Sequence, residues 1–354
     1  MEISVQKVKE RKPLPDEKTL GFGKIFTDRM FLMEYEAGRG WQNARIVPFG
    51  NLSLHPAATV LHYGAEVFEG LKAYRRADGR VQLFRPIENA RRLNASASRM
   101  CLPEIPEEDF LEIITTFVKA EERWVPYGAG TSLYLRPFLF GNDEALGVHA
   151  VHRAVFAVIA SPSGSYYAEG LNPVKILIED EDVRTVRGGT GYAKCGGNYG
   201  ASTRAGERAA REGYSQVLWL DGVERKYVEE VGAMNVMFLI GGVVVTPALT
   251  GSILPGITRK SCVELLKSKG VPVEERLLSA DELIAAARSG ALTEAWGTGT
   301  AAVVSPIGDL GFRGEKFVVG GGKIGKLTQS LYDELTAIQW GKAADPFGWT
   351  VVVD

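Results

Sequence analysis

A single lysine lies among six glycines in the stretch Gly188–Gly200, which reads GGTGYAKCGGNYG. Glycine adopts positive φ and lets the backbone approach a bound group closely, so this stretch suits a planar or phosphorylated ligand. A desolvated Lys194 would lose its proton and become an amine nucleophile, as Schiff-base chemistry with a carbonyl requires. The alternative is a mobile glycine loop with a solvated lysine. A phosphate-loop NTPase fits less well, because Ala193 and Cys195 flank the lysine where that motif needs Gly and Ser or Thr.

Three other stretches carry groups that bind phosphate. Residues 254–258, LPGIT, put backbone N–H groups and a hydroxyl at an expected helix start, where the helix dipole favours an anion. Residues 297–300, GTGT, form a turn with hydroxyls, and Arg91 and Arg92 could donate charge-assisted hydrogen bonds from an expected helix. Each has a plainer alternative: an ordinary helix start, an ordinary turn, or a solvated basic pair. Together with Lys194 they indicate a site for a phosphorylated cofactor.

An acidic pair, Glu229 and Glu230, interrupts the otherwise apolar stretch 227–235, YVEEVGAMN. A carboxylate buried in a strand region needs a cationic partner. A protonated pyridine nitrogen would be such a partner, and the ion pair would keep the ring positively charged as an electron sink. The alternative is that the glutamates face solvent at a strand end.

Length and composition narrow the class of protein. The 354 residues predict two domains, and 45% apolar with 24% charged residues is ordinary for a globular protein. A formal net charge of −2 gives no electrostatic case for binding nucleic acid or an anionic membrane. The three cysteines have no CxxC spacing and form no disulfide framework, which indicates a reducing compartment. These are Cys101, Cys195 and Cys262.

The N-terminal ten residues are charged throughout, and no apolar run is long enough to span a bilayer. We therefore expect a cytoplasmic protein. The histidines never reach the spacing of a zinc protease, so we expect them to be structural and expect no metal site. They are His55, His62, His149 and His152.

Periodicity and turn residues predict the elements that must position these groups. Helices are expected over 86–100, behind Pro106, over about 198–212, after Gly256, from a capping box of Ser279 and Glu282, and over about 324–340. The helix behind Pro106 repeats apolar residues at Phe110, Ile113, Ile114, Phe117 and Val118. Strands are expected at 30–35, 45–47, 67–74, 81–84, 132–139, 154–160, 174–178, 216–220, 235–240 and 243–245.

The breaker cluster at 162–165, PSGS, marks the expected domain boundary. We predict a small N-terminal domain over 1–162, a linker over 163–172 and a larger, strand-rich cofactor-binding domain over 173–354. Helices and strands come in blocks more than in strict alternation, which favours an α+β fold over a Rossmann fold or a barrel.

The motifs resemble, in the same order, the cofactor motifs of the class IV (fold type IV) pyridoxal-phosphate aminotransferases. The stretches that carry this resemblance are KCGGNYG (194–200), EVGAMN (230–235), LPGITR (254–259) and GTGTA (297–301). Three further stretches look like the branched-chain amino acid aminotransferase: FEGLKAY (68–74), LFRP (83–86) and LYLRP (133–137). The similarity runs from about Gly21 to the C-terminus.

The resemblance implies a role for each matching residue. Lys194 would form a Schiff base with pyridoxal 5′-phosphate and shuttle a proton between the substrate Cα and the cofactor C4′. Glu230 would hold the pyridinium nitrogen, and Tyr199 the phenolate oxygen. The phosphate would be bound by Arg92, Ile257, Thr258 and Thr300. The substrate would be bound by Tyr63, Phe68, Tyr134, Arg136, Tyr166, Thr300 and Ala301. In this family a loop of the partner subunit completes a site between two domains, so Leu146 and Val148 would enter the neighbour's pocket in a homodimer.

The implied reaction is reversible transamination of L-leucine, L-isoleucine or L-valine with 2-oxoglutarate, in branched-chain amino acid biosynthesis or breakdown. Two departures from the mammalian enzymes are visible: residues 302–305, AVVS, replace a redox-active CxxC, and Ala233 replaces a hydroxyl residue beside Glu230. The alternatives are D-amino acid transamination, aminodeoxychorismate lyase chemistry, and a non-catalytic protein that binds a phosphorylated ligand. The last predicts no covalent link to Lys194 and no aromatic substrate pocket.

Overall fold

The computed structural model describes residues 1–164 and 171–353. The chain divides into two compact units, each described here by itself. Unit 1 comprises Met1–Ala168, Ala193–Gly196 and Ala337–Asp354, and unit 2 comprises Glu169–Tyr192 and Gly197–Thr336. Residues 193–196, which include Lys194, and the last 18 residues thus group with unit 1, whereas the sequence placed both in the second domain. Most of the expected linker, 163–172, lies outside the described residues.

Unit 1 is built on a nine-stranded sheet in the order β1-β3-β2-β8-β7-β5-β6-β18, with β4 paired to β7. Its strands are β1 Ser4–Val5, β2 Arg29–Glu36, β3 Gly40–Pro48, β4 Glu66–Phe68, β5 Leu71–Arg75, β6 Val81–Phe84, β7 Ser132–Gly141, β8 Arg153–Ser163 and β18 Thr350–Val353. Its helices are α1 Thr59–Tyr63, α2 Pro86–Arg99, α3 Glu107–Ala120 and the short 3-10 turns η1 Glu17–Thr19 and η2 Glu122–Trp124.

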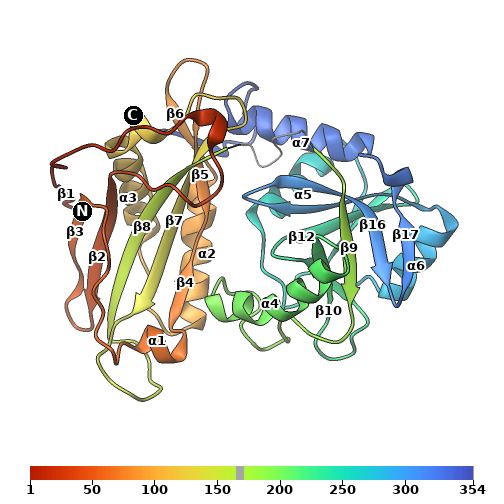
Figure 1. Ribbon diagram of the computed structural model, residues 1–354, viewed down its shortest axis with the longest axis horizontal. Helices are drawn as coiled ribbons and strands as arrows, with labels where there is room; N and C mark the ends of the chain where they lie inside the picture. Colours follow the sequence, from red (N-terminus) through yellow and green to blue (C-terminus); the bar gives the residue numbers. More distant parts are fainter. Residues whose placement is uncertain (165–170, 354) are drawn as a thin grey trace. The chain divides into compact units, whose positions relative to one another are not determined.

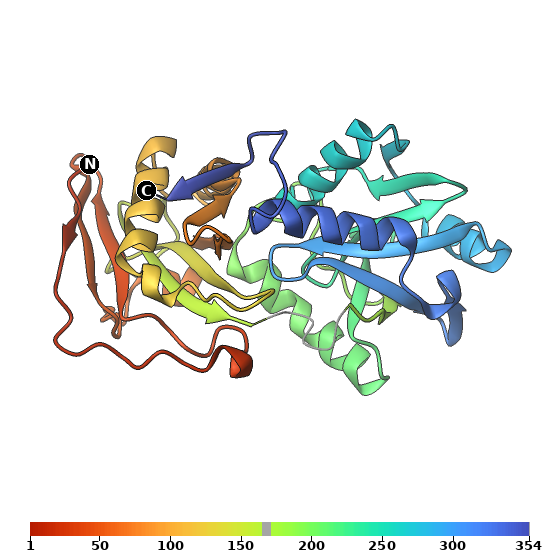
Figure 2. The same cartoon turned by 90° about the horizontal axis from the view of Figure 1, so that it is seen from above.

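Helices α2 and α3 pack against this sheet, as Figure 1 shows. All five apolar residues that predicted α3 are buried, which confirms the helical period read from the sequence. They join one hydrophobic core with sheet residues such as Phe31 and Phe156. The C-terminal strand β18, which the sequence did not predict, pairs antiparallel with β6 and lies beside α3 (Figure 2).

The strand expected over 67–74 is two strands, β4 and β5, separated by Glu69 and Gly70. Glu69 is fully buried, and its carboxylate is held by Arg92 and Asn89. A Cβ at Gly70 would lie 2.1 Å from the Tyr134 hydroxyl, so a side chain there would displace that tyrosine. The break therefore places a buried carboxylate between two strands.

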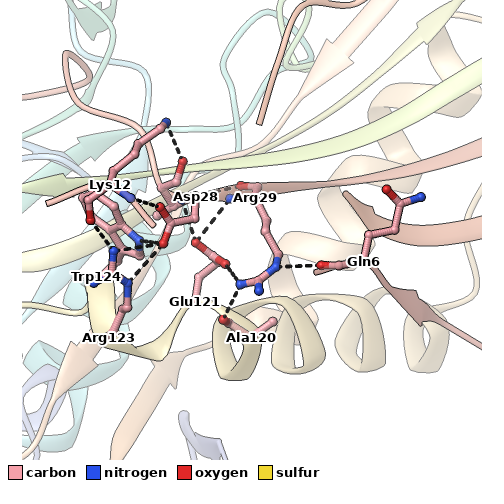
Figure 3. Close-up of polar contacts among 9 residues, drawn as sticks. Gln6, Lys12, Asp28, Arg29, Ala120, Glu121, Arg123 and Trp124 are labelled. Carbon is pink, nitrogen blue, oxygen red and sulfur yellow. Dashed lines mark hydrogen bonds and ion pairs between the residues drawn. The ribbon is translucent and has the colours of Figure 1, made fainter. Parts of the chain in front are cut away.

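A buried polar cluster fixes the N-terminal segment of unit 1 to the end of α3 (Figure 3). The Asp28 carboxylate accepts hydrogen bonds from the Lys12 backbone N–H at 2.9 Å and the Trp124 indole N–H at 3.0 Å. The Glu121 carboxylate accepts from the Asp28 backbone N–H at 2.8 Å and forms an ion pair with Arg29 at 2.7 Å. These bonds satisfy buried charges, and they tie β2 to the turn after α3.

Unit 2 is built on a second nine-stranded sheet, in the order β11-β10-β9-β16-β15-β12-β13-β14, with β17 paired to β16. Its strands are β9 Val174–Glu179, β10 Gln216–Leu220, β11 Val228–Val231, β12 Asn235–Ile240, β13 Val243–Pro247, β14 Val273–Arg276, β15 Leu292–Gly299, β16 Val303–Phe312 and β17 Glu315–Val318. Its helices are α4 Gly196–Arg211, α5 Ile257–Ser268, α6 Ala280–Ser289, α7 Lys326–Gln339 and the 3-10 turn η3 Gly320–Gly322, although the first residue of α4 and the last three of α7 group with unit 1.

Several predictions for unit 2 are confirmed. The Ser279 hydroxyl accepts the Glu282 backbone N–H at 3.0 Å, as the capping box predicted for α6. Parallel and antiparallel strand pairs mix in this sheet, so the expected α+β class is confirmed. In the two described ranges of the chain, no helix has the length and apolar character needed to cross a membrane.

Candidate active site

The backbone around Lys194 is held at three points within unit 1. The Lys194 N–H donates to the buried Ser96 hydroxyl at 2.9 Å, and its carbonyl accepts the Phe68 N–H at 3.0 Å. Two residues on, the Gly196 N–H donates to the Glu66 carboxylate. The Lys194 Nζ lies 4.6 Å from the centre of the Phe68 ring. The lysine is therefore fixed and half-buried, which contradicts the alternative of a mobile loop with a solvated lysine.

Phe68 is also in contact with a second cation. The Arg136 guanidinium lies 4.7 Å from the Phe68 ring centre, and its Nη2 donates to the Tyr134 hydroxyl at 2.9 Å. Burial raises the pKa of the nearby Glu66 carboxyl, while the Arg136 charge lowers it by less. Unit 1 thus brings Lys194 and Arg136 to the ring of Phe68, with Tyr134 bonded to Arg136.

Arg92, predicted to bind phosphate, forms a buried ion pair that the sequence did not indicate. Its Nε and Nη2 donate to the Glu69 carboxylate at 2.7 and 2.8 Å. Burial raises the pKa of Glu69, but the charge and hydrogen bonds of Arg92 and the charge of Lys194 outweigh it, so the pKa lies below the ordinary value of a glutamate. Its neighbour Arg91 is exposed and bonded to Glu107. The alternative of a solvated basic pair therefore holds for Arg91 but not for Arg92.

We predict that Glu69→Gln lowers the melting temperature of the protein by roughly 10 °C, since breaking a buried pair costs about 3–5 kcal/mol. The Glu69 charge stabilises the fold above pH 4.5, and this contribution is lost as the pH falls through the depressed folded pKa. Calorimetry of both proteins from about pH 7 to about pH 3 should therefore show a difference that shrinks only in acid. Glu107→Gln, which breaks the surface pair with Arg91, is the matched control and should change little.

The remaining residues predicted for unit 1, which include the two expected in a partner's pocket, are less enclosed. Tyr63 is 41% exposed, and its hydroxyl accepts the Gly147 N–H at 2.9 Å. Leu146 and Val148, on the same loop, are 73% and 85% exposed, which suits side chains that contact another molecule. Tyr166 lies outside the described residues.

In unit 2, Glu230 already has a cationic partner in the protein. The carboxylate accepts the Leu254 N–H at 2.7 Å and pairs with the Arg184 Nε at 3.2 Å. Arg184 is itself buried and donates to the backbone carbonyls of Gly191 and Ser252 at 2.8 and 2.9 Å. Sequence reasoning missed Arg184, because nothing in the spacing between 184 and 230 indicates that the two residues meet.

The neighbouring Glu229 has different partners. The Ser252 hydroxyl donates to its carboxylate, and burial raises its pKa. Glu229 and Glu230 are only 5% and 3% exposed, so the alternative that they face solvent is wrong. Successive side chains of a strand point to opposite faces, and this is why the two carboxylates meet different groups.

The predicted phosphate-binding helix start is present in unit 2. Helix α5 begins at Ile257 after Gly256, and among the described residues no side chain caps it. A Cβ at Gly256 would lie 1.9 Å from the Asn235 Oδ1, so only glycine fits this approach. The buried Thr298 hydroxyl, on the strand residue paired with Asn235, has no hydrogen-bond partner within the described part of the chain. An uncapped helix start and an unsatisfied hydroxyl fit a phosphate group.

The other predicted residues of unit 2 lie on the expected elements. Thr258 is in the first turn of α5, Thr300 and Ala301 are in the turn between β15 and β16, and Tyr199 is in the first turn of α4. The chain leaves unit 2 after Tyr192 and re-enters it at Gly197. Lys194 therefore lies on a four-residue segment that groups with unit 1 and continues at both ends into unit 2.

Comparison with known proteins assigns the chain to a family. The model of the amino-transferase class IV family matches residues 66–310. Branched-chain-amino-acid transaminase 1 of Bacillus subtilis is 53% identical over 352 residues, 99% of each chain. The branched-chain amino acid aminotransferase of Escherichia coli matches with a TM-score of 0.75 and 27% identity, over 92% of this chain and 99% of that one. A branched-chain amino acid aminotransferase of T.th., complexed with N-(5′-phosphopyridoxyl)-L-glutamate, matches with a TM-score of 0.72 and 28% identity, over 91% and 98%. The chain therefore belongs to the amino-transferase class IV family.

Proposed function

We propose that the protein is a pyridoxal-phosphate-dependent branched-chain-amino-acid transaminase, which exchanges the amino group of L-leucine, L-isoleucine or L-valine with 2-oxoglutarate. The observation that carries the proposal is the group around Phe68, where Lys194 lies 4.6 Å and Arg136 4.7 Å from the ring centre. An amine, an apolar ring and a guanidinium suit a substrate with an α-amino group and either an apolar side chain or a second carboxylate.

The donors in each unit fit the proposed cofactor. When bound, pyridoxal phosphate supplies an electron sink for the bond broken at the substrate Cα. Lys194 would hold it covalently and move the proton at its Nζ. Glu230 would hold the ring nitrogen as pyridinium, and Tyr199 would donate a hydrogen bond to the ring oxygen. Phosphate ligands would come from Arg92, Ile257, Thr258 and Thr300. The uncapped start of α5 and the unsatisfied Thr298 hydroxyl support this assignment.

For the substrate, Phe68 and Tyr134 would line the site for the aliphatic chain, while Arg136 would bind the distal carboxylate of glutamate. The ligand of the T.th. enzyme, a phosphopyridoxyl group joined to L-glutamate, supports glutamate as the second substrate. Tyr63, Tyr166 and the turn at Thr300 and Ala301 would complete the substrate contacts.

The proposal extends to assembly and location. Leu146 and Val148 would enter the pocket of a second copy, which makes a homodimer the smallest active form. We place the enzyme in the cytoplasm, in keeping with its unpaired, widely separated cysteines. Sedimentation of the purified protein tests the homodimer, and fractionation of the cells that produce it tests the location.

The visible spectrum of the purified protein tests the proposed function. The yellow absorption of bound cofactor should fade with L-leucine and return with 2-oxoglutarate, which reports both half-reactions, whereas D-leucine should leave it unchanged. Bleaching by D-leucine alone would instead indicate D-amino acid transamination. A protein that stays colourless with added pyridoxal phosphate would leave the non-catalytic phosphate-binding alternative.

A further inference from the structure

The loop that joins strands β7 and β8 brings one carboxylate and two imidazoles together. Asp143, His149 and His152 each offer a ligand atom, and these atoms all lie within 4.8 Å of one another. The two imidazole rings are stacked, with centroids 5.4 Å apart. None of the three has a role in the proposed transaminase site.

Asp143 is the fixed member of this group. It is 7% exposed, and its carboxylate accepts the backbone N–H of His152 at 3.1 Å and that of Arg153 at 3.2 Å. Each carboxylate oxygen has two lone pairs, so these bonds leave acceptor capacity on both oxygens. The carboxylate is thus oriented before any ligand arrives.

Each histidine keeps a ring nitrogen that can offer a lone pair to a ligand. The His149 Nδ1 lies 2.8 Å from the Ala150 carbonyl oxygen, and only an N–H makes a hydrogen bond there, so Nδ1 carries the hydrogen and Nε2 the lone pair. A ring N–H bonded to a backbone carbonyl is the usual way in which a metal-binding histidine is oriented. The His152 Nδ1 lies 3.8 Å from the Asp143 Oδ1. Both rings are exposed and can turn at little cost.

We propose that Asp143, His149 and His152 bind one divalent transition-metal ion such as Zn²⁺, with water as its fourth ligand. Two imidazoles and a carboxylate suit Zn²⁺, Cu²⁺, Ni²⁺ or Co²⁺ and not Mg²⁺ or Ca²⁺, which take oxygen ligands. Bonds of about 2.0–2.1 Å in a tetrahedron put ligand atoms about 3.4 Å apart. The present spacing of up to 4.8 Å must shorten by about 1.4 Å to reach it, which the exposed rings can do by turning.

The sequence did not predict this site, because its histidines do not have the spacing of a zinc protease. Here His152 follows three residues after His149, and Asp143 lies at the other end of an exposed loop. The metal would hold Asp143 close to His149 and His152, and Leu146 and Val148 lie on the loop between these ligands. Metal binding itself does not depend on the proposed transaminase activity.

Titration calorimetry with Zn²⁺ tests the site in the full-length protein. Wild type should bind one ion per chain, and both His149→Ala and Asp143→Asn should weaken this binding at least about 10-fold. His55→Ala, which removes an exposed histidine outside the cluster, is the matched control and should bind as wild type does. Equal zinc affinity in wild type and His149→Ala, or no binding by wild type, would overturn the proposal.

Co²⁺ gives a second measurement that reads the ligands directly. Visible absorption of tetrahedral Co²⁺ without a thiolate band should appear in wild type and in His55→Ala and be absent from His149→Ala. A thiolate band would place the ion on a cysteine such as the exposed Cys101 and overturn the assignment. The unfolding profiles of His149→Ala and His55→Ala should match wild type without metal, since both histidines are exposed.

Discussion

Replacement of Lys194 by alanine should lower the rate of leucine transamination by at least about 10³-fold, because the variant lacks the amine that moves the substrate Cα proton. The fold should persist: the bonds from Lys194 to Ser96 and Phe68 are made by backbone atoms that alanine keeps. Steady-state turnover and single-turnover absorbance changes in the presence of pyridoxal phosphate measure the loss. The effect is thus assigned to the side chain alone.

Lys175→Ala is the matched control for this experiment, because Lys175 is an exposed lysine on strand β9. It should retain full turnover. A small primary amine added to Lys194→Ala should restore part of the rate by replacing the missing base. Multiple turnovers by Lys194→Ala without added amine would show that another group moves the proton, and the role proposed for Lys194 would be wrong.

The local features of the fold were predictable because their causes lie close together in the sequence. The apolar period of α3, the capping box of α6 and the Gly256 start of α5 each depend on residues within about one or two turns. The motif around Lys194 was found for the same reason. The α+β class followed from the order of such local elements.

The parts that were missed depend on contacts between distant residues. Glu69 meets Arg92, Ser96 meets Lys194, and Arg184 meets Glu230, and no periodicity reports these pairings. The single strand expected over 67–74 is interrupted at Glu69. The buried carboxylate there pairs with an arginine 23 residues away, which local sequence does not indicate. The pairing of β18 with β6 is another long-range contact, and strand propensity alone does not specify it.

Glu230→Gln is the second substitution with a large expected effect. Glutamine keeps an oxygen that accepts the Leu254 N–H, and Arg184 keeps its bonds to the carbonyls of Gly191 and Ser252. The variant should therefore fold and still bind cofactor, with a lower melting temperature because the buried pair with Arg184 is broken. Its turnover should fall by about 10²–10³-fold, since a preorganised charge aimed at the reacting group is worth this much.

Glu229→Gln is the control that the structure makes available on the same strand. Glu229 is as buried as Glu230, but its partner is the Ser252 hydroxyl, which a glutamine oxygen also accepts. Spectral titration with pyridoxal phosphate and steady-state turnover with L-leucine should be measured for both variants. We expect Glu229→Gln to turn over nearly as fast as wild type and Glu230→Gln to lose turnover.

The reverse pair would assign the ring nitrogen to Glu229 and leave Glu230 as the structural partner of Arg184. The carboxylate that accepts the Leu254 N–H and pairs with the Arg184 charge is the one oriented from two sides before any ligand binds. Preorganisation of this kind is what lets a buried charge act on a bound ring without rearranging. For that reason we expect the larger loss at Glu230.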